Sequence, residues 1–369
     1  MAGRAVNRSN PKQRRSADRA RRQSLTGRRA PACSVVIRSF NEARHIGRLL
    51  TGILSQTMGE VDIVLVDSGS TDGTMAIASR YPVRVVTISP RDFTFGRSLN
   101  LGCRAAKADL IVVASAHVYP VYPDWLERLL EPFQDRRVAM TYGKQRGDER
   151  TRFSEGQIFH KWFPETSVAW QDHPFCNNAN AAIRKALWKQ HPFDESLPAL
   201  EDIEWATWAT SRGRGLAYVA EAEVVHVHDE TPREVFGRYR REAMALRRIH
   251  PHTHFRVTDL VRLFLANIVS DGRHAWREGR LGKVAAEVLW FRWMQFWGTY
   301  RGFSLVGPLT QELRQAFYYP RGQTGGSSET PRDVRPLDYA RAADLGRAAD
   351  GEASRASRVE RPRSRSYHG

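Results

Sequence analysis

The amino-acid sequence predicts an α/β protein built on a mainly parallel sheet flanked by helices. Between residues 33 and 114, short runs of β-branched and aliphatic residues alternate with segments of helical periodicity, a pattern typical of successive β-α-β units. Clusters of polar residues follow three of the four predicted strands, at the edge where ligands of parallel sheets bind. These observations predict a binding site at the carboxyl ends of the strands.

The first four strands are predicted from continuous apolar runs, which are typical of strands buried on both faces. They cover residues 33–39, 61–66, 83–88 and 110–114. Helices are expected between them, at residues 46–53, 74–80 and 98–106, because apolar residues recur there at helical intervals.

Beyond residue 121 the pattern is less regular. Strands are expected at residues 138–142, 179–183 and 223–227, and helices at 124–130, 201–211 and throughout 232–318. We therefore divide the chain into a sheet domain at residues 31–231 and a helical region at 232–320, with disordered basic tails at 1–30 and 321–369.

The charge of the 369-residue chain is concentrated at its ends. The formal net charge is +17, of which residues 1–30 carry +9 and residues 321–369 carry +3. The three cysteines cannot form a disulfide framework. The sequence contains no uncharged run of 18 apolar residues, the length needed to span a membrane. We expect a cytoplasmic protein, either free or peripheral at the inner face of the membrane.

Two polar corners, residues 39–42 and 67–73, lie at the ends of the first two predicted strands. The Asp67-Ser-Gly-Ser-Thr-Asp-Gly segment offers glycines for close approach of a ligand and short polar side chains to hold it. A structural turn with a helix cap would have the same composition. Two such corners on neighbouring strands favour a binding site over a turn alone.

Taken together, these segments resemble glycosyltransferase family 2 over roughly residues 33–245. The matching pieces are Val35-Val-Ile-Arg-Ser-Phe-Asn-Glu, Ile63-Val-Leu-Val-Asp-Ser-Gly-Ser-Thr-Asp-Gly-Thr, Leu99-Asn-Leu-Gly, Pro192-Phe-Asp-Glu, Glu201-Asp202 and Val224-Val-His-Val-His. The resemblance implies a GT-A fold, in which a Rossmann-like sheet binds a nucleotide-sugar. By position, Phe40, Glu42, Asp67, Ser68 and Asn100 would contact the donor.

The family's metal-binding Asp-x-Asp motif is replaced here by Ser115-Ala116-His117. His117 and His228, with His226 as the alternative, would then hold a divalent cation, Mn²⁺ or Mg²⁺. Residues 226 and 228 would point to the same face of a strand. Alternatively, His117 only bonds a phosphate or packs against the loop, with Ser115 beside it in the donor pocket.

The resemblance makes Asp202, next to Glu201, the general base of an inverting sugar transfer. Acidic residues at a helix start also serve as caps, which is the structural alternative. Arg238-Tyr-Arg-Arg241 replaces the Gln-x-x-Arg-Trp motif of processive enzymes, so we expect transfer of one sugar, with Arg238 and Arg241 near the phosphates.

The acceptor is expected to be a glycan or a lipid-linked glycan, with Asn177, Asn178 and Trp205 on its side of the cleft. The aromatic segment Val284 to Tyr300 is expected to pack against its own domain or another subunit, or to lie on a membrane. Two other readings stay open. One is an inactive family member that binds nucleotide or glycan. The other is a nucleic-acid binder, disfavoured because the charge outside the tails is small and no specific binding motif is present.

Overall fold

The computed structural model describes residues 31–304 and 334–339 of the chain. In this part a nine-stranded sheet has the order β3-β2-β1-β4-β8-β6-β9-β5, and β7 pairs with β9 beside this path. The strands are β1 (Cys33–Ser39), β2 (Val61–Asp67), β3 (Val83–Thr87), β4 (Leu110–Ser115), β5 (Val118–Pro120), β6 (Val138–Arg146), β7 (Val168–Gln171), β8 (Asn180–Arg184) and β9 (Gly215–His226).

The first half of the sheet is parallel, as predicted. Strand β1 pairs in parallel with β2 and β4, and β2 pairs in parallel with β3. Successive residues of β1 enter different cores: Val36 packs on one side of the sheet, and Val35 and Ile37 pack on the other. Burial on both faces explains why these strands are continuous apolar runs without polar alternation.

The second half of the sheet is mixed. Strand β8 is antiparallel to both β4 and β6, whereas β6 is parallel to β9. The twelve-residue β9 also holds β5 and β7 in antiparallel pairs. The sequence predicts only the end of β9 and neither of the two short strands, because β5 and β7 are defined by pairing with β9 and not by an apolar run of their own.

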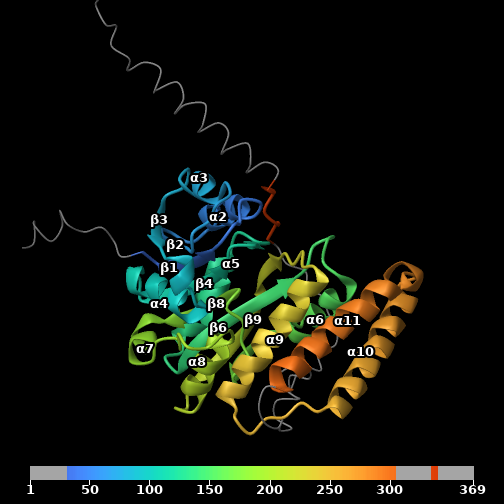
Figure 1. Ribbon diagram of the computed structural model, residues 1–369. Coiled ribbons are helices and arrows are strands. Elements are labelled where there is room, and N and C mark those ends of the chain that lie inside the picture. Colours follow the sequence, from blue (N-terminus) through green and yellow to red (C-terminus); the bar gives the residue numbers. More distant parts are fainter. Residues whose placement is uncertain (1–30, 305–333, 340–369) are drawn as a thin grey trace, which may run out of the picture.

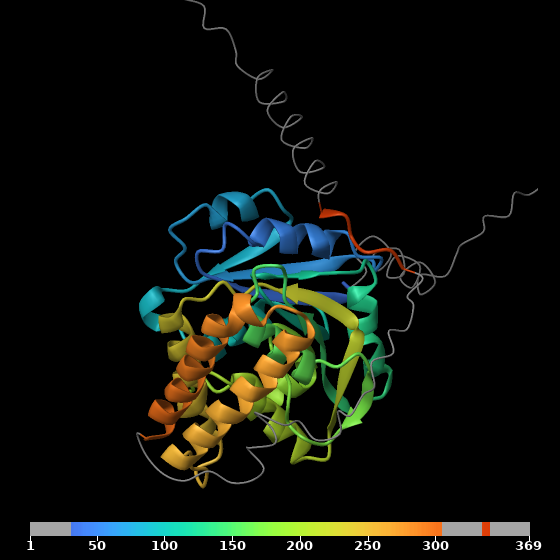
Figure 2. The ribbon, with the colours of Figure 1, turned by 90° about the vertical axis from the view of Figure 1, so that its right-hand side faces the viewer.

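The sheet domain is flanked by helices on both sides (Figures 1 and 2). They are α2 (Ile46–Leu54), α3 (Thr74–Ala78), α4 (Phe95–Ala105), α5 (Trp125–Leu130), α6 (Phe153–Trp162), α7 (Lys185–Gln190) and α8 (Glu201–Thr210). Short 3₁₀ turns lie at Pro90–Asp92 and Glu131–Gln134. Helices α6 and α7 are additions to the predicted set.

Three helices follow the sheet domain: α9 (Pro232–Ile249), α10 (Val257–Arg277) and α11 (Leu281–Ser304). Helix α9 begins with a capping box formed by Thr231 and Glu234. A buried ion pair joins the α10–α11 hairpin, with Arg292 Nε 2.8 Å from Asp271 Oδ2. The predicted helical segment 305–320 and the tail 1–30 lie outside the described residues.

Helix α11 contains the aromatic segment at residues 284–300. Several of its polar residues face inward: Arg292, Gln295 and Thr299 are buried, and Glu287 accepts a hydrogen bond from the Phe153 amide. Phe291 and Phe296 are also buried. The expectation of packing within the chain is therefore correct for most of this helix.

A short stretch of the C-terminal tail lies against the sheet domain. The Leu337 amide donates to the Val121 carbonyl over 2.9 Å, and the Tyr339 hydroxyl bonds to the Pro120 carbonyl. The Tyr339 ring also meets Tyr119 edge to face. Residues 334–339, within the segment expected as a disordered tail, therefore contact the sheet domain through two of its backbone carbonyls and through the Tyr119 ring.

Cys33, Cys103 and Cys176 are free and buried, in agreement with the expectation that they form no disulfide framework. Within the described ranges, each helix is too short or too polar to cross a bilayer.

Candidate active site

Two polar corners at the ends of β1 and β2 are joined into one structure. Ser39 and Asp67 are register partners at the strand ends. The Asn41 side chain, on a residue with a φ of 56°, accepts from the Thr71 amide over 2.8 Å. The Glu42 amide in turn donates to Thr74 Oγ1 over 2.7 Å. These bonds fix the backbone at Asn41 and Glu42.

Asp67 organises its own turn. Its carboxylate accepts from the amides of Gly69 and Ser70, each over 3.0 Å, and from the Ser70 hydroxyl. Ser68 donates to the Ser39 carbonyl. An ionised carboxylate offers about four acceptor sites, so one remains for a ligand donor such as a base N–H. Phe40 is 52% exposed on the adjacent corner, as a stacking surface would be.

Three histidines from two segments meet beyond the end of β4. His117 follows β4, His226 ends β9 and His228 lies two residues later; ligand nitrogens of all three lie within 4.8 Å of one another. The His117 and His226 rings are stacked at 5.0 Å, and Nε2 of His226 lies 2.9 Å from Nε2 of His228. Both downstream histidines therefore join His117.

Each ring is held through Nδ1 by an acceptor. His117 Nδ1 lies 2.8 Å from Glu42 Oε1. His226 Nδ1 lies 2.7 Å from Gln145 Oε1, and His228 Nδ1 lies 2.9 Å from Glu155 Oε1. Bonding at Nδ1 fixes the tautomer and leaves Nε2 as the available lone pair. Ser115 Oγ lies 3.1 Å from His117 Nε2, on the same side.

This histidine cluster (His117, His226 and His228) fits a divalent cation. With bonds of about 2.1 Å, neighbouring nitrogen ligands of one ion lie roughly 3 to 3.4 Å apart, close to the observed separation of His226 and His228. Burial lowers the pKa of His226 well below its usual range, with His228 adding to the effect, so this imidazole is neutral and free to ligate.

A second group of possible metal ligands consists of Glu155, His228 and Glu230. Its two carboxylates already pair with an arginine. Arg238 Nη2 lies 2.8 Å from Glu155 and 2.6 Å from Glu230. Burial by itself would raise the pKa of Glu155, but Arg238 and His228 hold it well below its usual range. This group is therefore an ion-pair network that supports His228.

Arg38 brings helix α8 to the same edge of the sheet. Arg38 lies in β1 opposite Ser115 of β4, and its Nη1 is 3.1 Å from Glu201 Oε1. The Glu201 carboxylate also accepts from Asn178 Nδ2 over 3.4 Å. The segments that carry Asp67, His117 and Asp202 are thus linked at one edge of the sheet, although they are distant in sequence.

The Asp202 carboxylate is buried and oriented by the backbone. Its oxygens accept from the amides of Asn178 and Ile203, each over 2.9 Å. Burial raises the pKa of Asp202 to about 7, with Glu201 adding to the rise while the two amides oppose it. Leu200 before it has a φ of 59°, a conformation that costs about 1 kcal/mol or more in a residue with a side chain.

Asp202 lines a small cavity of about 80 Å³ between α8 and α9. Asn177 and Cys176 line it from the sheet side, and Glu242 and His250 from the helical side. Burial raises the pKa of Glu242 to about 7. Two carboxyl groups that titrate near neutrality therefore share this cavity.

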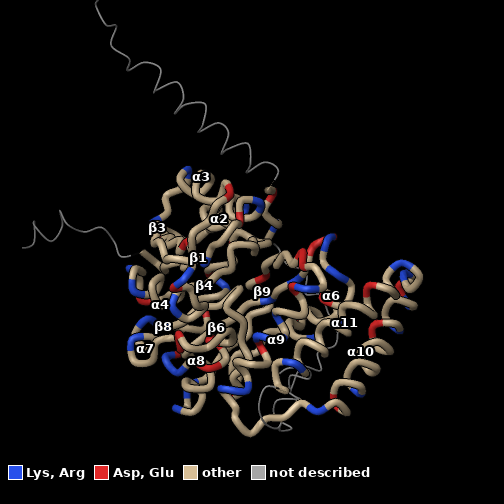
Figure 3. The backbone as a smooth tube through the Cα atoms, in the orientation of Figure 1, with Lys and Arg blue, Asp and Glu red and all other residues tan. Residues whose placement is uncertain are grey.

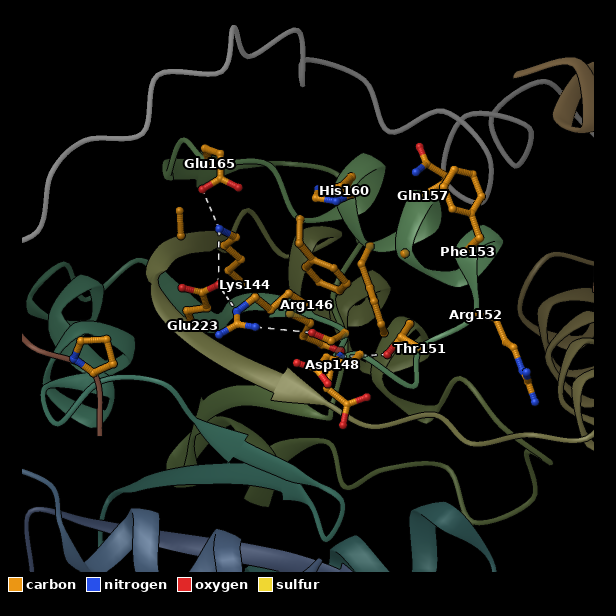
Figure 4. A pocket seen from close by; sticks show the side chains of 18 of the residues that line it. Lys144, Arg146, Asp148, Thr151, Arg152, Phe153, Gln157, His160, Glu165 and Glu223 are labelled. Carbon is orange, nitrogen blue, oxygen red and sulfur yellow. Dashed lines mark hydrogen bonds and ion pairs between the residues drawn. The ribbon is translucent and has the colours of Figure 1, made fainter. Parts of the chain in front are cut away.

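A larger cavity of about 810 Å³ is lined by residues that contact the histidine cluster, and Figure 4 shows side chains of its wall. Gln145, which holds His226, is part of its wall, and so is Phe159, whose ring centre is 6.0 Å from that of His226. Its walls are charged: Arg146 lies 2.9 Å from Glu223. Such a lining suits a polar ligand.

Three sequence-based assignments need correction. Asn100 is buried, donates to Phe193 and Glu195, and accepts from Trp188 and Phe193, so its side chain is fully used within the fold. Trp205 is fully buried and donates to the His191 carbonyl, so it belongs to the core and not to an acceptor surface.

The third correction concerns Arg238, which the sequence predicts to lie near the phosphates. Its positive charge is balanced by Glu155 and Glu230 within the fold. Arg241 is exposed on the same helix, one turn further along. The residues that sequence reasoning missed are Arg38, Gln145 and Glu155. No local pattern marks them, because each acts on a residue more than 70 positions away.

Comparison with known proteins identifies the domain. Residues 34–191 match the family model described as Glycosyl transferase family 2. Residues 34–191 therefore resemble a glycosyltransferase family 2 domain. The chain is similar to the O-antigen chain rhamnosyltransferase WbaN of Salmonella anatum, with 30% identity over 196 residues, 50% of this chain and 62% of the relative. RfbN of Salmonella typhimurium, also an O-antigen chain rhamnosyltransferase, is 27% identical over 56% of this chain and 69% of its own.

Solved structures with a related shape are more distant. The mannosyltransferase PcManGT of Pyrobaculum calidifontis, in complex with GDP-Man and Mn²⁺, is 19% identical with a TM-score of 0.49, over 79% of this chain and 91% of its own. TarS 1-349 of S. aureus, in complex with UDP, is 16% identical with a TM-score of 0.46, over 78% and 92%.

Proposed function

We propose that this family 2 glycosyltransferase moves one sugar from a nucleotide-sugar to a hydroxyl of a glycan or lipid-linked glycan, with inversion at the anomeric carbon. The observation that carries the proposal is the Asp202 carboxylate, which is buried, aimed by two amides and has a pKa of about 7. A carboxylate whose pKa is raised towards neutrality is a better proton acceptor for a hydroxyl than an ordinary one.

In the proposed step, Asp202 removes the proton from the acceptor hydroxyl. The hydroxyl oxygen forms its bond to the anomeric carbon from the face opposite the leaving group. The bond between that carbon and the diphosphate oxygen breaks, and its electron pair stays on the nucleoside diphosphate. Attack from the opposite face inverts the configuration, and the small cavity that Asp202 lines is the proposed entry of the reacting hydroxyl.

The donor is proposed to bind at the corners formed by residues 39–42 and 67–70, with Phe40 and Asp67 at its base and ribose. His117, His226 and His228 would hold a divalent cation against the diphosphate. When bound, such a cation supplies positive charge that stabilises the departing diphosphate. Since imidazole suits transition metals better than Mg²⁺, the donor set favours Mn²⁺ of the two cations predicted from the sequence.

The relatives suggest the first substrates to test. Because two of them are named as O-antigen chain rhamnosyltransferases, we propose a nucleotide-activated deoxyhexose as donor and a growing polysaccharide as acceptor. The large charged cavity beside His226 is proposed to receive the acceptor glycan beyond the reacting sugar.

A product analysis tests this function. The full-length chain with Mn²⁺ is incubated with nucleotide-sugars and glycan acceptors, and the anomeric configuration of the product is determined by nuclear magnetic resonance. Inversion with release of the nucleoside diphosphate supports the proposal, whereas retention of configuration removes Asp202 from the role of base. Nucleotide binding with neither transfer nor donor hydrolysis supports the inactive family member.

A further inference from the structure

The outer face of the α10–α11 hairpin exposes apolar side chains that the proposed function does not use. Of the twelve large hydrophobic residues exposed in the described part of the chain, eight lie on these two helices. On α10 they are Val257, Val261, Leu265, Val269 and Trp276, with exposed fractions of 56, 46, 54, 49 and 72%; on α11 they are Leu281, Leu289 and Trp293. The intervals on α10 keep its five residues on one side of the helix.

The charges exposed on the hairpin are almost all positive. Between residues 257 and 304 the exposed basic residues are Arg262, Arg273, Arg277, Arg280, Lys283 and Arg301. Glu278 is exposed and pairs with Arg280, whereas Asp259 and Asp271 are buried and Glu287 is partly buried. Figure 3 shows blue residues at the turn of the hairpin.

Helix α10 is the outermost element of the helical region (Figures 1 and 2). It packs mainly on α11, through contacts such as Phe264 with Trp293, whose ring centres are 5.5 Å apart. The inner side holds Leu260, Leu263 and Ala275. The helix therefore has an apolar inner side that is covered and an apolar outer stripe that no described residue covers.

We propose that the α10–α11 hairpin docks on the surface of a bilayer that contains anionic phospholipid. The α10 stripe would enter the boundary between headgroups and acyl chains, and the arginines would contact headgroup phosphates. A helix that is apolar on one side, with basic residues and Trp at its margin, is suited to lying in that interface.

The charges favour a lipid surface over a second copy of this chain. Two copies that met through this face across a two-fold axis would bring like-charged arginines together, with one exposed acid per copy to offset them. An anionic bilayer complements the same set of charges. Each Lys or Arg near such a surface contributes about 1 kcal/mol of attraction.

The hairpin also borders the cavities beside the histidine cluster. Glu278 and Arg280 at its turn line the 810 Å³ cavity. Arg280 and Val284 line a neighbouring cavity together with Asp229, the residue after His228. If the proposed function holds, docking would bring a lipid-linked acceptor to the mouth of the site.

Flotation with lipid vesicles tests the proposal on the full-length chain. Vesicles of phosphatidylcholine, with and without a quarter of phosphatidylglycerol, are mixed with wild type, with the double variant Leu265→Ser/Val269→Ser, and with the matched control Leu54→Ser/Val85→Ser. All three proteins carry the same basic tails. The hairpin variant is expected to lose affinity for the anionic vesicles by about tenfold or more, because two apolar side chains no longer enter the lipid.

A second variant tests the contribution of the basic residues to vesicle binding. Arg273→Gln/Arg277→Gln is expected to bind the anionic vesicles about tenfold or more weakly and to lose much of the salt dependence that these residues cause. Circular dichroism and a thermal scan verify that each variant is folded, so that a loss of binding reports the surface.

Three results overturn the proposal. In the first, the hairpin variant floats as well as wild type. In the second, wild type does not float but is a dimer by light scattering, and Leu265→Ser/Val269→Ser makes it a monomer. In the third, wild type neither floats nor dimerises, so another part of the chain covers the stripe. Flotation needs no sugar donor, so binding without sugar transfer would contradict the proposed function and leave this inference intact.

Discussion

Nε2 of His226 faces Nε2 of His228 across 2.9 Å, while Gln145 and Glu155 hold the two rings from behind. The opposing nitrogens are therefore positioned by the fold before any ligand binds. An arrangement of this kind reduces the conformational entropy that is lost when a ligand binds, since the side chains are already ordered. Four of our predictions concern this cluster and Asp202.

Mn²⁺ alone is expected to stabilise the full-length chain through the histidine cluster. At a concentration 100 times its dissociation constant the ion would add about 2.7 kcal/mol to the free energy of unfolding. Mg²⁺ at the same concentration is expected to add less, because imidazole is a poor partner for it. His226→Ala should abolish the Mn²⁺ effect in a thermal scan, and the exposed His160→Ala serves as the control. A similar Mn²⁺ shift in both variants would place the ion elsewhere.

Glu155→Gln tests how the ion-pair network supports the cluster. The Gln side chain can still accept from His228, but Arg238 loses one of its two charged partners. Loss of such outer support commonly weakens metal binding by about 10 to 100-fold. We expect that range for Mn²⁺ in a calorimetric titration. An unchanged affinity with a lower melting temperature would show that Glu155 serves the fold alone.

Asp202→Asn is expected to lower kcat by about 100-fold or more while nucleotide binding is retained, since a general base contributes 10²–10⁴-fold. In wild type, kcat should rise with pH through about 7, as the carboxylate loses its proton. The variant should lack that rise. Glu204→Gln on the same helix is the matched control, because its carboxylate bonds His191 on the other side of α8. Equal losses in both variants would exclude a special role for Asp202.

The raised pKa of Asp202 also predicts how stability depends on pH. The folded chain keeps a proton that the unfolded chain releases between the ordinary value of 3.8 and about 7. The free energy of unfolding should therefore fall as pH rises through this window. Glu242 adds a slope of the same sign. Asp202→Asn should flatten the slope in urea unfolding at several pH values, and an unchanged slope would mean that Asp202 is ionised in the folded chain.

The parallel half of the fold and its polar edge could be predicted from the sequence, because each strand is a local apolar run that ends in a polar cluster. Ser39 pairs with Asp67, and Ser115 pairs with Arg38, at those ends. The partners behind the histidines could not be predicted. Glu155 reaches His228 only through the way α6 packs, which no local pattern encodes.

The burial of individual side chains is the second feature that the sequence could not predict. The family pattern places Asn100 at the donor, yet its side chain links α4 to the loop at Phe193. The same pattern places Trp205 on the acceptor side, although the packing of α8 buries its side chain completely. Position in a motif predicts the neighbourhood of a side chain, but the direction it faces depends on tertiary packing.

Gly298 lets α11 approach the backbone of α9. A Cβ added there would lie 2.6 Å from the Phe236 carbonyl oxygen, whereas a Cβ on Gly272 in α10 would meet open space. Gly298→Ala is therefore expected to lower the free energy of unfolding by about 1 to 3 kcal/mol, through forced displacement of packed helices. Gly272→Ala should raise it by about 0.5 to 1 kcal/mol, because alanine restricts the unfolded chain and favours the helix. Urea midpoints of the two variants measure the difference, and stabilisation by both would show that the α9–α11 contact is looser than the structure has it.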